Sequence, residues 1–396
     1  MDFWALGAFW FLLAVIADFA SIRLKISVAL VEIVVGILAA FFISLYWPSF
    51  SNLGADHEWI VFLASTGAVL LTFLAGAELD PAVMKTNWKE VLLIGLVGFF
   101  APFFGCAGIA YYILDWSLEA SWLVGVALST TSVAVVYAVM LDLGLNKTRF
   151  GKSVLAACFI NDLGTVIALG VIFAPFSYKT IMFIAASIVA LVVLPKLTSF
   201  VFKFWGGRHS ELESKFLLIF LFGLGALAYW AGSEPVLPAY LIGMVLATVM
   251  EKDLMLVRRV RAITFGLLTP FYFLRAGSLV SLPAIWIAPG IFVVLFIAKM
   301  LTKIIGVYPA AKLSKYPKKE AIYTTLLMST GLTFGTISAL FGLSHNIIDE
   351  AQYSNLVATV IASAIIPTVI ANLFFLPKHL LPKEEISPEL PHPSNK

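Results

Sequence analysis

The sequence predicts an all-α polytopic membrane protein. Of its 396 residues, 61% are hydrophobic and only 12% are charged, whereas a globular domain carries about 25% charged residues. The apolar residues form runs long enough to span the roughly 30 Å hydrocarbon core of a bilayer. The basic residues mostly lie in short clusters between these runs, so the net charge of +3 reflects membrane topology and not nucleic-acid binding.

Hydropathy and helix breakers predict thirteen transmembrane helices. With the seventh as a linker helix, the first six and the last six form two halves, which we expect to be inverted six-helix repeats. The predicted spans are residues 3–22, 28–46, 59–77, 91–114, 120–141, 153–174, 180–201, 216–231, 236–250, 262–280, 285–308, 320–342 and 353–376.

Basic residues occur in alternate loops, which sets the expected orientation. By the positive-inside rule, the N-terminus lies outside the inner (plasma) membrane and the C-terminus lies in the cytoplasm. Termini on opposite sides require an odd number of spans, in agreement with thirteen. The first apolar run follows Asp2 and precedes Arg23 and Lys25, the reverse of the charge order in a cleaved signal peptide, so we expect it to be retained.

The spans divide the chain into one membrane domain and a tail. We expect the domain to cover residues 1–377, with a first repeat over 1–175, a linker helix over 180–201 and a second repeat over 216–377. The proline-rich, polar segment 378–396 predicts a short disordered cytoplasmic tail.

The stretch FINDLGTVIALG (159–170) places two polar side chains inside an apolar run. Asn161 and Asp162 lie near the middle of the run 153–173, which contains no other ionisable residue. A carboxylate at the centre of a membrane helix costs at least ~2.5 kcal/mol, so it marks a functional site by default. We expect Asp162 to bind a proton or a sodium ion, and Asn161 to offer its amide oxygen to the cation or to hold the carboxylate.

Two further polar stretches lie at corresponding positions of the two halves, in the fifth and twelfth spans. They read LSTTSVAVV (128–136) and MSTGLTFGTIS (328–338). Such pairs indicate discontinuous helices that form a transport site, although small residues also serve plain helix packing. The expected site residues are Thr130, Thr131 and Ser132 in the first stretch, and Ser329, Thr330 and Thr333 in the second.

Cationic and acidic residues within the spans are candidate charge partners. Lys299 lies deep in the eleventh span and needs an internal partner, for which Asp162 is the favoured residue. Lys303 follows one turn later, and we expect its ammonium to snorkel to the interface. The remaining candidate partners are Arg275, Glu78 and Glu32.

Five short segments, in order along the chain, carry a family resemblance: LLTFLAGAELDP (70–81), ALSTTSVAVVYAVMLDLGL (127–145), FINDLGTVIAL (159–169), PFYFLRAGSLVSL (270–282) and AKMLTKIIG (298–306). Together they resemble the monovalent cation:proton antiporter superfamily, especially its bacterial NapA-like and Kef-like branch. The resemblance implies a homodimer with a dimerisation domain and a moving six-helix core, in which two discontinuous helices cross near Asp162. It also implies that Asp162 binds ion and proton, that Thr131 lies near the ion, and that Lys299 pairs with the site carboxylate.

The chain departs from that family pattern at four places. Asn161 replaces the first aspartate of the NapA-like pair, as in the typically electroneutral NhaP-like branch, yet Ala157 stands where NhaP-like members carry a glutamate. The segment MSTGLTFG (328–335) replaces the motif PRGE of many relatives, and Arg275 stands at a position that is usually apolar. These departures concern ion identity and coupling.

The expected function is secondary active exchange of a monovalent cation for protons by alternating access. Sodium is the favoured cation, with lithium as another, and one carboxylate predicts electroneutral one-for-one exchange. The alternatives are potassium/proton antiport, Kef-type potassium efflux and sodium-coupled symport of an organic anion. A membrane enzyme is disfavoured because no histidine lies within a span and no nucleophile–base constellation is present there. We expect no cofactor, and sodium, protons and lipid as partners.

Overall fold

The structure, a computed structural model, describes residues 3–24, 28–47, 50, 52–77, 87–173, 177–205, 211–233 and 235–381. Helices account for most of these residues, and no strand occurs within the described ranges.

The first half of the chain forms helices α1 (Phe3–Leu24), α2 (Val28–Tyr46), α3 (Glu58–Ala77), α5 (Trp88–Tyr112), α6 (Leu118–Ser129), α7 (Val133–Asp142), α8 (Arg149–Phe173) and α9 (Tyr178–Trp205). The second half forms α10 (Leu212–Trp230), α11 (Val236–Lys252), α12 (Leu254–Ile263), α13 (Thr269–Ser278), α14 (Leu282–Ile287), α15 (Pro289–Leu313), α16 (Lys318–Met328), α17 (Thr333–Ser344) and α18 (Glu350–Ile370). Single π-helical turns follow α12 (Thr264–Leu268) and α18 (Ala371–Phe375), and short 3-10 helices cover Leu145–Lys147 and Lys378–Leu380.

Every predicted span coincides with helix, which confirms the all-α membrane fold. Ten helical segments are long and apolar enough to cross a bilayer, with α16 and α17 counted as one. The other three predicted spans correspond to the broken pair α6–α7, to α11, and to the π-turn with α13, which are shorter. Thirteen crossings therefore stay a prediction.

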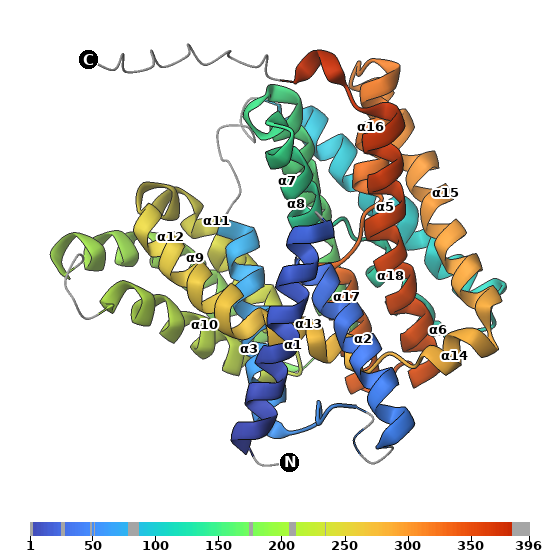
Figure 1. Cartoon of the computed structure of the whole chain (residues 1–396). Helices are drawn as coiled ribbons and strands as arrows, with labels where there is room; N and C mark the ends of the chain where they lie inside the picture. The colour runs from blue at the N-terminus through green and yellow to red at the C-terminus, as the bar shows by residue number, and fades with distance from the viewer. Residues whose placement is uncertain are drawn as a thin grey trace, which may run out of the picture.

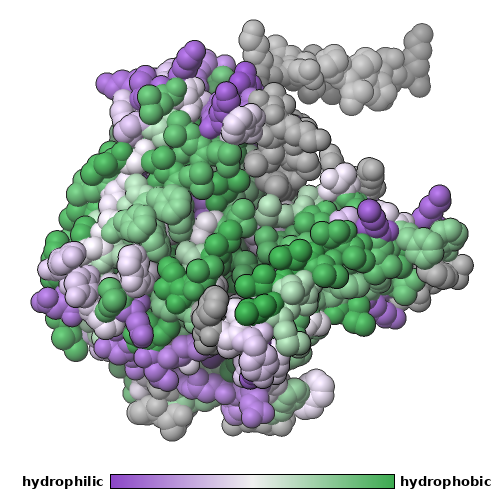
Figure 2. Space-filling view, turned by 180° about the vertical axis from the view of Figure 1, so that it is seen from behind, coloured by the Kyte–Doolittle hydropathy of each residue, from purple (hydrophilic) through white to green (hydrophobic). Residues whose placement is uncertain are grey.

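The surface has the layered polarity of a membrane protein. Figure 2 shows a broad hydrophobic band between two ends where hydrophilic side chains gather. The described chain starts at one end of the molecule and finishes at the other (Figure 1), as an odd number of crossings requires.

The helices pack as two groups. Helices α5, α6, α7, α8, α15, α16, α17 and α18 pack among themselves, and α1, α2, α3, α9, α10, α11 and α13 form the second group. In Figure 1, α5, α15, α16 and α18 stand together on the right, and α9, α10 and α12 lie on the left. The groups meet where α11 contacts α8, and where Tyr353 of α18 donates a hydrogen bond to Ala276 O of α13 at 2.9 Å. Each group combines spans from both halves of the sequence, but the repeat boundaries at 1–175, 180–201 and 216–377 stay a prediction.

Glycines allow close helix contacts within the second group. A methyl group at Gly243 of α11 would overlap the backbone of Phe73 in α3, and one at Gly277 of α13 would overlap the backbone of Ile33 in α2. Small residues at such contacts are typical of membrane helix packing.

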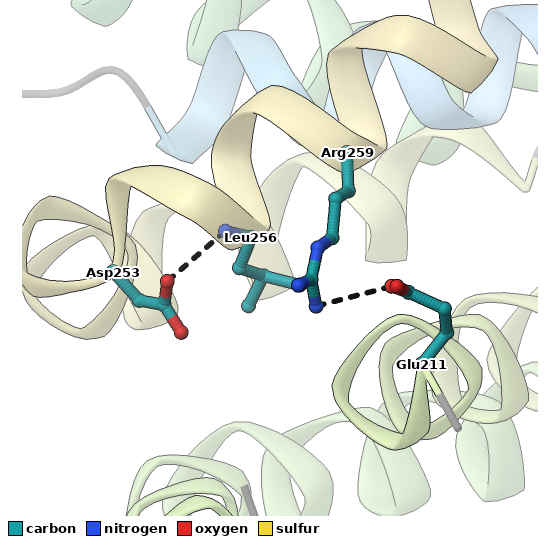
Figure 3. Close-up of polar contacts among 4 residues, drawn as sticks. All are labelled: Glu211, Asp253, Leu256 and Arg259. Atoms are coloured by element: carbon teal, nitrogen blue, oxygen red, sulfur yellow. Dashed lines mark hydrogen bonds and ion pairs between the residues drawn. The ribbon is translucent and has the colours of Figure 1, made fainter. Parts of the chain in front are cut away.

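Helix α12 is short and amphipathic, and polar contacts fix its position (Figure 3). The Asp253 carboxylate accepts a hydrogen bond from Leu256 N at 3.0 Å and so caps the helix. Arg259 Nη1 lies 3.1 Å from Glu211 Oε2 just before α10, which links the two helices. Both side chains are partly exposed, so this ion pair orients α12 more than it stabilises the fold. Of the predicted tail, residues 382–396 lie outside the described residues.

Candidate cation and proton site

Two helix breaks cross inside the first helix group. Residues 130–132 separate α6 from α7, and residues 329–332 separate α16 from α17. Ser132 N donates a hydrogen bond to Thr330 O at 2.9 Å, so the two broken segments contact each other backbone to backbone. The sequence prediction of two crossing discontinuous helices is confirmed.

The hydroxyl groups at the crossing satisfy the broken helix ends. Thr130 Oγ1 donates to Ala127 O at 3.0 Å, and Thr330 Oγ1 donates to Leu327 O at 2.7 Å. Each hydroxyl thus gives its only hydrogen to a local carbonyl, and the lone pairs of its oxygen stay available to other donors or to a cation. The broken helices therefore present a cluster of oxygen atoms at the depth of the crossing.

Lys303 of α15 connects the two breaks. Its side chain is fully buried, and Nζ donates to Ser129 O at 2.7 Å and to Thr131 Oγ1 at 3.0 Å. Thr131 Oγ1 in turn donates to Met328 O of α16 at 2.7 Å. The expectation that Lys303 snorkels to the interface is wrong, because the carbonyl freed at the end of α6 offers an internal partner and the negative end of a helix dipole.

Lys299 lies one turn before Lys303 and is also fully buried, but its Nζ has no hydrogen-bond partner in the described part of the chain. It lies beside the α16–α17 break, where a methyl group added to Gly331 would overlap Nζ. Within the described residues, Lys299 forms no ion pair with Asp162, whose electrostatic partner here is Lys303. A Lys299–Asp162 pair in another conformation stays a prediction.

Asn161 and Asp162 are both buried in α8, and neither is satisfied by its surroundings. Within the described residues, Asp162 Oδ1 and both polar atoms of the Asn161 amide have no hydrogen-bond partner. Asn161 faces α5, where a methyl group on Gly98 would lie 3.6 Å from Nδ2. Buried polar atoms without partners are costly and rare. Their presence side by side fits a site that a ligand completes.

Tyr240 of α11 is a site residue that sequence reasoning missed. It is fully buried, its hydroxyl donates to Phe159 O of α8 at 2.9 Å, and it lies within electrostatic range of Asp162. Its ring also meets Phe334 of α17 edge-on, with centroids 5.9 Å apart. Tyr240 therefore joins the second helix group to the crossing. No feature of its sequence neighbourhood signals this contact, because it depends on how the two groups dock.

The remaining predicted residues fall into three places. Glu32 is buried in α2 of the second group, with Asp18 as its electrostatic neighbour. Arg275 of α13 donates through Nε to Ala55 O at 2.9 Å, in the turn before α3. Glu78 lies outside the described residues. The residues that gather at the crossing and are buried there are Thr130, Thr131, Ser132, Ser329, Thr330 and Thr333.

Comparisons with known proteins agree on one family. Residues 9–376 match the family described as sodium/hydrogen exchanger, transmembrane. A probable Na+/H+ antiporter 3 of Methanocaldococcus jannaschii is 26% identical, over 82% of this chain and 86% of that protein. A Na+/H+ antiporter of Enterococcus hirae is 25% identical, over 82% of this chain and 88% of that protein.

A solved structure shares the fold. The sodium proton antiporter MjNhaP1 of Methanocaldococcus jannaschii superposes with a TM-score of 0.67 at 15% identity, covering 94% of this chain and 97% of that one. The resemblance to the monovalent cation:proton antiporter superfamily, drawn from five short sequence segments, is confirmed by the family match. Because the family match extends over nearly all of the chain, including both helix breaks and the Asn161–Asp162 pair, this protein belongs to the transmembrane sodium/hydrogen exchangers.

Proposed function

We propose that this protein exchanges sodium for protons across the membrane and that both ligands bind at Asp162. The observation that carries the proposal is a buried carboxylate oxygen without a hydrogen-bond partner among the described residues, next to an equally unsatisfied Asn161 amide. Carboxylate, amide and hydroxyl oxygens are the hard ligands that small cations prefer. The names of the relatives support sodium, and lithium has the same ligand preference.

The exchange follows from competition at one carboxylate. A protonated Asp162 has no charge with which to hold a cation, and a cation bound to Asp162 excludes the proton. Lys303 also acts on this carboxylate, and its ammonium is held in place by Ser129 O and Thr131 Oγ1. The positive charge of Lys303 thus offsets the negative charge of Asp162 when neither the proton nor the cation is bound.

Alternating access is the transport mode that the architecture favours. The crossing lies wholly within the first helix group, and Asp162 lies near Tyr240 of the second group. Movement of the first group against the second would expose Asp162 to one side and then the other. We expect a homodimer in the inner membrane, with the N-terminus outside, the C-terminus in the cytoplasm and no cofactor. The apolar, exposed face of α9 is available to lipid or to a second copy.

The stoichiometry that we propose is one cation for one proton. Asn161 carries no charge, so Asp162 is the one member of this pair that can exchange a proton for a cation. A cycle of this kind moves no net charge. Lys299 offers the competing route, because a buried ammonium without a partner is expensive and its deprotonation would add a second proton.

Potassium is the second candidate cation. A relative from Bacillus cereus that is 24% identical over 87% of this chain is named a Na+/H+-K+ antiporter. Oxygen ligands alone do not distinguish sodium from potassium. Symport of an organic anion has less support, since Arg275 is engaged with Ala55 O in the second helix group.

The experiment compares two Asp→Asn variants in proteoliposomes, with a proton-sensitive dye and parallel additions of sodium, lithium and potassium. Asp162→Asn should abolish cation-dependent proton flux while the protein still folds. The matched control is Asp115→Asn, because Asp115 is exposed and has a left-handed backbone (φ 52°) that asparagine also tolerates. Cation-dependent flux that persists in Asp162→Asn would refute the proposed site.

A further inference from the structure

A cavity of about 400 Å³ lies outside the crossing, between the start of α16 and the π-turn that follows α18. Its lining residues are Lys319, Leu373, Phe374, Leu376, Lys378 and His379. A hydrogen bond between Tyr323 and Asn372, 3.0 Å long, holds α16 against the π-turn. The cavity is thus formed by two elements that are fixed to each other.

One wall of this cavity is cationic. Lys319 and Lys378 are exposed, and neither forms an ion pair within the described residues. His379 Nε2 lies 2.9 Å from Glu320 Oε1, and the Glu320 side chain is only 11% exposed. Glu320, the carboxylate next to the cavity in the described part of the chain, is therefore already engaged and turned inward. Two ammonium groups remain to attract an anion.

The apolar lining residues of the cavity face outward. Leu373 is 71% exposed and Phe374 is 69% exposed, directly after the membrane helix α18. In a membrane protein such side chains contact acyl chains. The cavity therefore joins a cationic surface to an apolar one at the end of the membrane helix α18.

We propose that this cavity binds an anionic phospholipid. The headgroup phosphate would lie between Lys319 and Lys378, and an acyl chain would run along Leu373 and Phe374. Basic pockets between membrane helices bind anionic headgroups in this way. A soluble phosphate would gain nothing from the two apolar side chains. The positively charged ammonium group of a zwitterionic lipid would be repelled by the lysines.

The test measures lipid binding to the purified full-length protein in detergent by native mass spectrometry. Phosphatidylglycerol and phosphatidylcholine are titrated against the wild type and against the double variant Lys319→Gln/Lys378→Gln. The matched control is Lys315→Gln/Lys318→Gln, which removes the same charge from exposed positions outside the cavity. Each lysine near an anionic lipid surface contributes roughly a factor of five. The cavity variant should therefore bind phosphatidylglycerol about 25-fold more weakly, and the control should match the wild type.

Three further variants test the proposal: Phe374→Ser, a chain that ends at Leu381, and Asp162→Asn. Phe374→Ser should weaken phosphatidylglycerol binding without changing the response to glycerol 3-phosphate, the soluble probe. Equal weakening by the cavity and control variants would overturn the proposal, as would displacement of the lipid by equimolar glycerol 3-phosphate.

A chain ending at Leu381 should bind phosphatidylglycerol like the full chain. If phosphatidylglycerol bound only after this truncation, the cavity of the full chain would be occupied by Glu384 and Glu385 of its own tail, and the lipid assignment would be overturned. Asp162→Asn should leave lipid binding unchanged, so this result is independent of the proposed exchange.

Discussion

The ammonium of Lys303 donates a hydrogen bond to the backbone carbonyl of Ser129, 2.7 Å away, at the residue where α6 ends. The helix break leaves this carbonyl without its usual intrahelical donor, and the lysine replaces it. A positive charge at the carboxyl end of a helix is also favoured by the helix dipole. A lysine fully buried in a membrane protein is thus explained by a neighbour 174 residues away in the chain.

The two buried lysines of α15 should respond differently to replacement by methionine, which is of similar length. Lys303→Met leaves Ser129 O and Thr131 Oγ1 without their donor, so we expect about 3 kcal/mol of lost stability. Lys299→Met removes a charge that has no hydrogen-bond partner in the part of the chain that the structure describes, so the unfolding temperature should stay equal or rise. Thermal unfolding of the purified variants in detergent gives the comparison. A larger loss for Lys299→Met than for Lys303→Met would contradict the observed contacts.

Gly331 should not tolerate a side chain. A methyl group there would overlap Lys299 Nζ and approach Thr130 Oγ1 to 2.9 Å, so Gly331→Ala should push the two broken helices apart. We expect at least a tenfold loss of exchange, by analogy with the cost of small displacements at reacting centres. The control is Gly223→Ala, where the added methyl group meets nothing within 4 Å. Combining Gly331→Ala with Lys299→Ala should restore part of the thermal stability, and no restoration would show that the clash lies elsewhere.

Tyr240→Phe should weaken the contact between α11 and α8. The variant loses the hydrogen bond to Phe159 O and keeps the ring, so the cost should be about 1 kcal/mol in stability. Because the hydroxyl lies within electrostatic range of Asp162, the apparent sodium affinity should change by up to about fivefold, the equivalent of 1 kcal/mol. Tyr229→Phe is the control, since that side chain is 81% exposed. Indistinguishable transport by the two variants would remove Tyr240 from the site.

The charge moved in each cycle can be measured directly. If Asp162 alone exchanges proton and cation, the wild type should give no sustained current on a solid-supported membrane. Asn161→Asp adds a second carboxylate at a buried position where the described residues supply no hydrogen-bond partner, so this variant should give a current. A sustained current from the wild type that Lys299→Gln abolishes would identify Lys299 as a second proton carrier.

Much of this architecture could be predicted from the sequence, because membrane helices follow from local hydropathy. The breaks at 130–132 and 329–332 were also predictable, since hydroxyl and glycine residues inside apolar runs are expensive unless they serve a site. The contacts between distant segments were not predictable. The position of Lys303 in α15, one turn beyond Lys299, suggests that its ammonium reaches the interface. In the structure the ammonium instead donates to the carbonyl oxygen of Ser129 at the end of α6. Tyr240 carries no local signal, because its partner Phe159 belongs to the other helix group.

The Thr131 hydroxyl accepts from Lys303 and donates to Met328 O, so a single chain of hydrogen bonds joins α15, the α6–α7 break and α16. If one broken helix slid past the other, Thr131 would lose either its donor or its acceptor, and an unsatisfied polar group within the membrane is costly. These hydrogen bonds therefore fix the two broken helices and α15 relative to one another. During transport the three should move as one rigid body, and the surface at which the two helix groups move against each other should lie where α8 contacts Tyr240 of α11.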